Sequence, residues 1–152
     1  MAGDGPEVKT LQRYCLDNDL SHNVIFLGTV HHERIDMYYK MADIVLLPST
    51  RSDNIEEATS LAMLEGMICK KVVIATAIGG LKEIIKDNKN GLLIEDKNSQ
   101  QIAEAIEKVY HNKNFYESLS TNAYNYALNN HGYISHAQKF IEFYSQLIEK
   151  RV

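Results

Sequence analysis

The chain has 152 residues, of which 45% are hydrophobic and 24% charged. This composition is typical of one globular domain that buries a core without disulfides or metals. The formal net charge of -4 argues against the basic surface that a nucleic-acid-binding protein needs. No apolar run or signal-peptide pattern predicts membrane insertion or export. We therefore expect a cytoplasmic protein. No cluster of cysteines and histidines predicts a metal site, and the sequence suggests no cofactor.

Short apolar runs alternate with longer segments of helical period, which is the pattern of βα units around a parallel sheet. A helix is predicted at 6–18. Four strands follow, each almost continuously apolar, as expected when helices cover both faces of a sheet: 23–27, 43–47, 72–76 and 91–95. Helices are predicted between them at 33–41, 57–69 and 80–86. The fold class is therefore α/β, a doubly wound parallel sheet.

After the last strand the pattern is purely helical, with helices predicted at 99–111, 115–128 and 134–150. We therefore expect one domain over 1–152 that ends in the C-terminal helices of 115–150. The last helix carries an apolar stripe at 3.6-residue spacing: Ile134, Ala137, Phe140, Ile141, Tyr144, Leu147 and Ile148. This stripe fits packing on the domain's own core, which we favour, or contact with a partner domain.

In open parallel sheets, ligands bind outside the carboxyl ends of the strands. The first strand is followed by Gly28, Thr29 and Val30, where a glycine lets the backbone approach a flat ligand, although a simple turn explains the tripeptide equally well. The third strand is followed by Gly79 and Gly80. This pair is a weak motif, because many tight strand-to-helix turns contain one, but we include both glycines among the expected substrate-binding residues.

The helix predicted after the second strand contains the main candidate site. Thr59 and Ser60 are expected in its first turn, where free amides and the helix dipole favour a pyrophosphate. Glu57 would repel phosphate and is better explained as an acceptor for sugar hydroxyls. Glu65 lies eight residues later, about 12 Å along a continuous helix. The alternative is that Glu57 only complements the dipole and Glu65 is solvated.

Taken in order, these segments resemble the C-terminal domain of the group 1 glycosyltransferases, family 4 of the retaining GT-B enzymes. The matching segments are GDGP at 3–6, VIFLGTV at 24–30, MADIVLLPS at 41–49, EATSLAMLEGM at 57–67, VVIATAIGGLKEII at 72–85 and NGLLIED at 90–96. Together they cover about residues 3–110. EATSLAMLEGM is similar to the family's Glu-x7-Glu motif.

The resemblance implies a Rossmann-like donor domain that binds a nucleotide-diphospho-sugar. It implies that Glu57 holds donor-sugar hydroxyls near the reacting carbon and that Glu65 takes the ribose hydroxyls. The amides of Thr59, Ser60 and Leu61 would receive the distal phosphate, while Gly28, Thr29 and Val30 would line the base. Transfer would be retaining, to a glycan or lipid-linked acceptor, without a metal, and the intact enzyme would associate peripherally with membranes.

Several positions depart from the family pattern. Lys70, Lys71 and Val72 stand where the family has Gly-Lys-Pro, Lys82 stands for a proline, and Ala58 stands for a frequent glycine. The family also has two further strands and a basic pair ahead of the GDGP turn, and an N-terminal domain that binds the acceptor. We expect these to be absent from the chain, which would then be inactive alone.

Without the first two strands, the strand at 23–27 would lack neighbours. We expect it to pair with the strand at 43–47. The alternatives are that another copy of the chain fills the gap or that residues 1–19 are poorly ordered. Two other functions compete with the glycosyltransferase. One is a nucleotide-sugar-binding module without catalysis, and the other is a nucleotide-sugar 2-epimerase of GT-B architecture.

Overall fold

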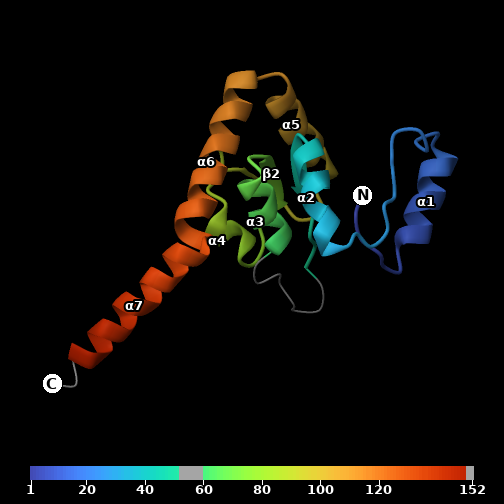
Figure 1. Ribbon diagram of the computed structural model, residues 1–152. Coiled ribbons are helices and arrows are strands. Elements are labelled where there is room, and N and C mark those ends of the chain that lie inside the picture. Colours follow the sequence, from blue (N-terminus) through green and yellow to red (C-terminus); the bar gives the residue numbers. More distant parts are fainter. Residues whose placement is uncertain (52–59, 150–152) are drawn as a thin grey trace. The chain divides into compact units, whose positions relative to one another are not determined.

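The computed structural model of the protein describes residues 1–51 and 60–149, and the chain divides into two units, Met1–Tyr38 and Tyr39–Val152. The expectation of one domain over 1–152 stays a prediction. The elements follow one another in this order, and Figure 1 labels the helices and β2: α1 (Val8–Asp17), α2 (His32–Met41), β1 (Ile44–Leu47), α3 (Leu61–Ile68), β2 (Val72–Thr76), α4 (Leu81–Ile84), β3 (Leu92–Ile94), α5 (Ser99–Tyr110), α6 (Lys113–His131) and α7 (Tyr133–Glu149).

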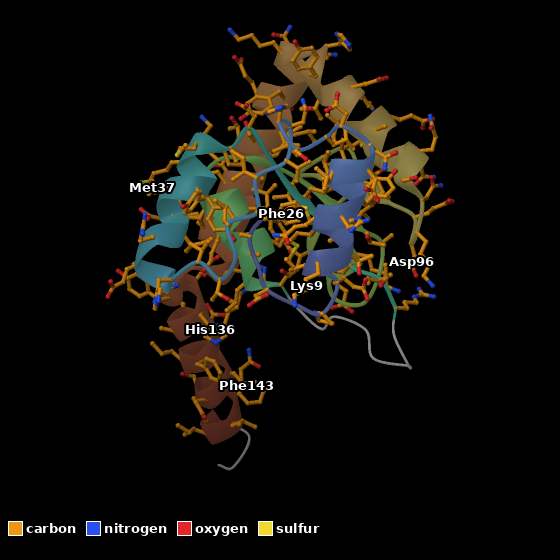
Figure 2. The ribbon with its side chains drawn as sticks, turned by 90° about the vertical axis from the view of Figure 1, so that its right-hand side faces the viewer. Lys9, Phe26, Met37, Asp96, His136 and Phe143 are labelled. Carbon is orange, nitrogen blue, oxygen red and sulfur yellow. The ribbon has the colours of Figure 1, made fainter. Side chains whose placement is uncertain are left out.

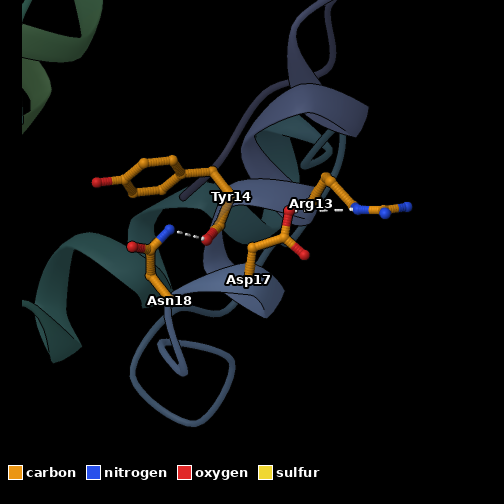
Figure 3. A network of polar contacts seen from close by, with 4 residues as sticks. All are labelled: Arg13, Tyr14, Asp17 and Asn18. Atoms are coloured by element: carbon orange, nitrogen blue, oxygen red, sulfur yellow. Dashed lines mark hydrogen bonds and ion pairs between the residues drawn. The ribbon is translucent and has the colours of Figure 1, made fainter.

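In the first unit, helix α1 ends in a compact hydrogen-bonded turn. The Asn18 side chain donates to the Tyr14 carbonyl at 2.9 Å, and Arg13 pairs with Asp17 at 3.3 Å (Figure 3). Asp19 adopts a left-handed conformation with φ 57°, and the next amide, of Leu20, donates back to the Cys15 carbonyl at 2.7 Å. This is the geometry that commonly terminates helices.

The predicted strand at 23–27 does not form, and its predicted pairing with 43–47 is wrong. Its backbone bonds instead to the start of the chain: the Met1 amino group donates to the Ile25 carbonyl, and the Leu27 amide donates to the Met1 carbonyl at 2.9 Å. The Gly3 amide donates to the Gly28 carbonyl at 2.9 Å. The apolar run is thus hydrogen-bonded to residues 1–3 without forming a regular strand.

The second unit contains a parallel sheet in the order β1-β2-β3. In its register Ile44 pairs with Val72, and Ile74 pairs with Leu92. The predictions that the segments at 43–47, 72–76 and 91–95 are strands, parallel and side by side, are therefore confirmed. Within the described residues, β1 is paired on one side only.

Helices cover both faces of this sheet, because the side chains of β2 alternate between two apolar clusters. Val73 and Ala75 pack with residues of α3, α4 and α6. Val72 and Ile74 pack on the other face with residues of α5 and the first turns of α6. All five residues of β2 are buried, which explains why the strand reads as a continuous apolar run. The α/β class with two helical layers is confirmed.

The apolar stripe of α7 does not pack on the domain core, so the favoured interpretation of it is wrong. None of the residues 133–148 is buried, and Phe140, Ile141 and Tyr144 are 49%, 65% and 58% exposed. The aromatic rings contact one another along the helix, with His136 4.9 Å from Phe140. Figure 2 labels His136 and Phe143 on this helix.

Helix α3 lies against β1 at a glycine. A Cβ atom at Gly66 would lie 2.9 Å from Val45 Cγ2 and 3.2 Å from Val45 Cβ. Valine is branched at Cβ and cannot swing away freely. The absence of a side chain at Gly66 therefore sets how closely α3 approaches the sheet.

We predict that Gly66→Ala lowers the free energy of unfolding by about 1–3 kcal/mol, because the added methyl overpacks the contact with Val45. Urea denaturation followed by circular dichroism measures the change. Gly5→Ala is the matched control, since nothing lies within 4 Å of a Cβ atom there, and it should change stability by less than about 0.5 kcal/mol. Equal effects of the two substitutions would contradict the close packing of α3.

Helix α3 ends with a lysine in the left-handed conformation. Lys70 has φ 57°, its amide donates to the Met67 carbonyl at 2.9 Å, and the Lys71 amide donates to the Gly66 carbonyl at 3.0 Å. This pair of bonds is the Schellman motif, in which glycine is usual at the position of Lys70. The turn therefore forms although Lys70 replaces the family's glycine. The Cβ atom of Lys70 makes the left-handed conformation less favourable than it would be for glycine.

We predict that Lys70→Gly raises the free energy of unfolding by about 0.5–1 kcal/mol, because glycine adopts positive φ without a Cβ clash. Lys70→Ala, which removes the same charge and keeps the Cβ, should give no gain. Paired urea titrations of the two variants separate the backbone effect from the charge effect. A gain of the same size in Lys70→Ala would refute the conformational explanation.

Candidate functional site

The three parallel strands end at one edge of the sheet, at Leu47, Thr76 and Ile94. A small cavity of about 170 Å³ lies at this edge, with Thr50, the buried Thr76 and Lys97 in its wall. Helix α3 ends shortly before β2 begins, so it runs back along the sheet and its first turn lies toward the same edge. The segments that follow the predicted strands at 43–47, 72–76 and 91–95 therefore lie at the carboxyl edge of this sheet.

The predicted phosphate-binding helix begins later than expected. Glu57 and Thr59 lie outside the described residues, so the roles predicted for them stay predictions. Ser60 is extended, with φ -100° and ψ 118°, and α3 begins at Leu61. The prediction that Ser60 lies inside the first helical turn is wrong, and the 12 Å estimate for a continuous helix no longer applies.

Residue Ser60 instead occupies the N-cap of α3. It is buried, and its side chain makes no capping bond. The first amides of the helix, beginning with that of Leu61, have no acceptor in the preceding turn of a helix. The leucine side chain is 73% exposed. The first amides of α3 are thus potential donors at the position where the family resemblance implies a phosphate.

The Gly79-Gly80 pair forms the turn between β2 and α4. Gly79 has φ 44°, a conformation that favours glycine, and Gly80 is the N-cap of α4 with φ -71°. The Ala77 amide, two residues before Gly79, donates to the Ile94 carbonyl at 2.8 Å. This geometry explains the first glycine by the turn itself, so a donor contact at Gly79 and Gly80 stays a prediction.

In the first unit, Gly28 is also left-handed, with φ 63°, and open space surrounds the position of a Cβ atom. Thr29 is exposed and Val30 is half-buried. Their predicted contact with a base stays a prediction.

The carboxylate of Glu65 has a defined partner, which sequence analysis missed. Tyr39 Oη donates a hydrogen bond to Glu65 Oε2 at 3.0 Å, and both side chains are half-buried. Burial raises the pKa of Tyr39, and the hydrogen bond and negative charge of Glu65 raise it further. Tyr39 therefore remains a protonated donor at neutral pH. The solvated alternative for Glu65 is not what the structure shows.

A second contact ties the end of α2 to the same region. Lys71 Nζ, just before β2, donates to the Lys40 carbonyl at 2.9 Å. Tyr39 and Lys40 both lie in the last turn of α2. The hydroxyl that reaches Glu65 is thus carried on a helix end that is anchored beside it.

A wider hollow of the second unit lies elsewhere, between β1 and helices α5 and α6. It has a volume of about 750 Å³ and is mainly apolar, lined by Ile44, Leu46, Ile106, Val109, Tyr110 and Tyr116 among others. Its wall includes Ala42 and Asp43, which precede β1. It therefore reaches the amino end of that strand, away from the carboxyl edge where ligands of such sheets bind. None of the helices in the described ranges has the length and apolar content of a membrane span.

A parallel sheet that is covered by helices on both faces, with loops at the carboxyl ends of its strands, is the architecture of Rossmann-like domains. The family model described as "Glycosyl transferases group 1" matches residues 1–126. The chain belongs to this glycosyltransferase family.

Relatives support the same assignment. The chain is 33% identical over 123 residues to an uncharacterised glycosyltransferase of Methanocaldococcus jannaschii, covering 81% of this chain and 30% of that protein. It is 33% identical over 106 residues to the D-inositol 3-phosphate glycosyltransferase of Mycobacteroides abscessus, covering 69% of this chain and 23% of that protein. The chain spans about a third of the length of the first curated relatives it matches.

Solved structures agree on the GT-B fold. An Anabaena protein, HepE, solved in complex with UDP matches with a TM-score of 0.84 and 26% identity, over 95% of this chain and 40% of that one. The C-terminal domain of a group 1 family glycosyltransferase from Francisella tularensis matches with a TM-score of 0.74 and 30% identity, over 85% of this chain and 66% of that one.

We predict that the free energy of unfolding of the chain falls as pH rises above 10.0, the ordinary pKa of tyrosine. The free energy of unfolding of the Tyr39→Phe variant should fall less over the same range. Above that pH the unfolded state releases the Tyr39 proton, whereas the folded state keeps it. The folded state then binds more protons, so unfolding becomes more favourable. Urea midpoints at pH 8 and pH 11 measure both changes, and the lysines common to both proteins cancel. Equal losses would show that the Tyr39 pKa is not raised.

Proposed function

We propose that the chain is the donor-binding part of a retaining glycosyltransferase that uses a nucleotide-diphospho-sugar. The observation that carries this proposal is the Glu65 carboxylate on α3, which accepts a hydrogen bond from Tyr39. The first amides of α3 lie toward the carboxyl edge of the sheet. Carboxylate acceptors and helix-terminal amides are the groups that a ribose diol and a pyrophosphate require. Membership of the glycosyltransferase family supports the same function.

In this proposal the residues have separate roles. Glu65 accepts the ribose hydroxyls, and the amides of Thr59, Ser60 and Leu61 bind the distal phosphate. Glu57 holds the donor sugar, and Gly28, Thr29 and Val30 line the base. Stabilising the charge of the leaving diphosphate is the main catalytic task. No metal or other cofactor takes part.

The donor class is supported by relatives. HepE was solved with UDP and with UDP-glucose, and a relative from Mycolicibacterium smegmatis, 29% identical over 108 residues, is named as a GDP-mannose-dependent mannosyltransferase. We therefore include transfer of a hexose to a glycan or lipid-linked acceptor in the proposal. In this proposal the acceptor is bound by polypeptide outside this chain. The intact enzyme works in the cytoplasm and associates peripherally with a membrane.

We predict that the 152-residue chain binds a nucleoside diphosphate weakly, with a dissociation constant of about 1 mM, and transfers no sugar by itself. Titration of the 15N-labelled chain with UDP, GDP and ADP and their hexose conjugates, followed by NMR, measures binding. Glu65→Gln should weaken binding about tenfold, because hydrogen bonds to a charged acceptor are lost. Glu107→Gln, which changes an exposed carboxylate on α5, should leave it unchanged. Absence of any saturable shift would overturn the proposal.

A further inference from the structure

The Tyr39–Glu65 hydrogen bond joins two helices that are distant in the sequence. The two residues are 26 positions apart, and their 3.0 Å bond is partly buried. Both ends are fixed independently: Gly66, next to Glu65, packs closely on Val45, and Lys71 anchors the Lys40 carbonyl next to Tyr39. The hydroxyl is therefore held in place by contacts other than the bond it makes.

The bond leaves the carboxylate available to a ligand. An ionised carboxylate has about four acceptor positions on its two oxygens. The single Tyr39 proton occupies one of them, on Oε2, and the other positions, including those of Oε1, can accept the two hydroxyls of a ribose diol. A glutamate fixed in one rotamer also loses less side-chain entropy when a ligand binds.

We propose that Tyr39 is a positioning residue for the nucleotide ribose: its hydroxyl orients the Glu65 carboxylate so that both ribose hydroxyls can donate to it. This inference rests on the proposed function, since it assigns the ribose of the donor to Glu65. It adds a residue on α2 to a site otherwise built from α3 and the strand-end loops.

The test compares Tyr39→Phe with the unchanged 152-residue chain, by NMR titration with UDP and with 2′,3′-dideoxy-UDP. The variant should bind UDP about threefold to tenfold more weakly, the effect of losing one orienting hydrogen bond. Its affinity for the dideoxy nucleotide should match that of the unchanged chain, because no ribose hydroxyl is left to orient. GDP and its dideoxy form are run in parallel.

Two controls separate positioning from structural damage. Tyr38→Phe removes the hydroxyl of the neighbouring half-buried tyrosine, which does not take part in the bond to Glu65, and it should change neither affinity. Tyr39→Phe in a Glu65→Ala background should have no further effect on UDP binding, because the group that Tyr39 orients is gone.

The outcomes are distinct. If Tyr39→Phe leaves UDP binding unchanged, or weakens UDP and dideoxy-UDP equally, the positioning role is overturned while donor binding stands. If the unchanged chain binds neither UDP nor GDP, the proposed function fails, and this inference fails with it. An effect confined to the hydroxylated nucleotides and abolished in the Glu65→Ala background establishes the role.

Discussion

Burial of β2 on both faces is the constraint on which the second unit depends. A strand with every side chain buried needs a neighbouring strand on each side and a helical layer above and below it, because its backbone and its side chains must all be removed from water. The chain supplies β1 and β3 as neighbours, with α3, α4 and α6 on one face and α5 on the other. The loops at the carboxyl edge then follow from the parallel direction of the three strands.

The same packing positions the candidate site. Because Gly66 allows α3 to lie close to Val45, the preceding residue, Glu65, is carried on a helix with little freedom to shift. A half-buried carboxylate is costly without a hydrogen-bond donor, and the Tyr39 hydroxyl supplies one. Core packing and site geometry thus involve adjacent residues of one helix.

Two apolar surfaces of the second unit remain exposed in the described residues. One is the groove of about 750 Å³ beside β1, and the other is the stripe of α7 that includes Phe140, Ile141 and Tyr144. Contiguous exposed apolar surface of this kind usually marks a place where further polypeptide is bound. The chain matches only 30% and 33% of the length of two of its relatives.

The sequence by itself determined the elements whose cause is local. Continuous apolar runs predicted β1, β2 and β3, helical periodicity predicted α5 to α7 to within a few residues, and the ordered motifs led to the glycosyltransferase family and to Glu65. The tertiary structure decided whatever depends on a partner. The run at 23–27 has strand composition, yet it is hydrogen-bonded to residues 1–3 without forming a regular strand. The stripe of α7 defines an apolar face but not what covers it. The contact between Tyr39 and Glu65 joins residues 26 positions apart, and no periodicity encodes it, because it results from the tertiary arrangement of α2 and α3.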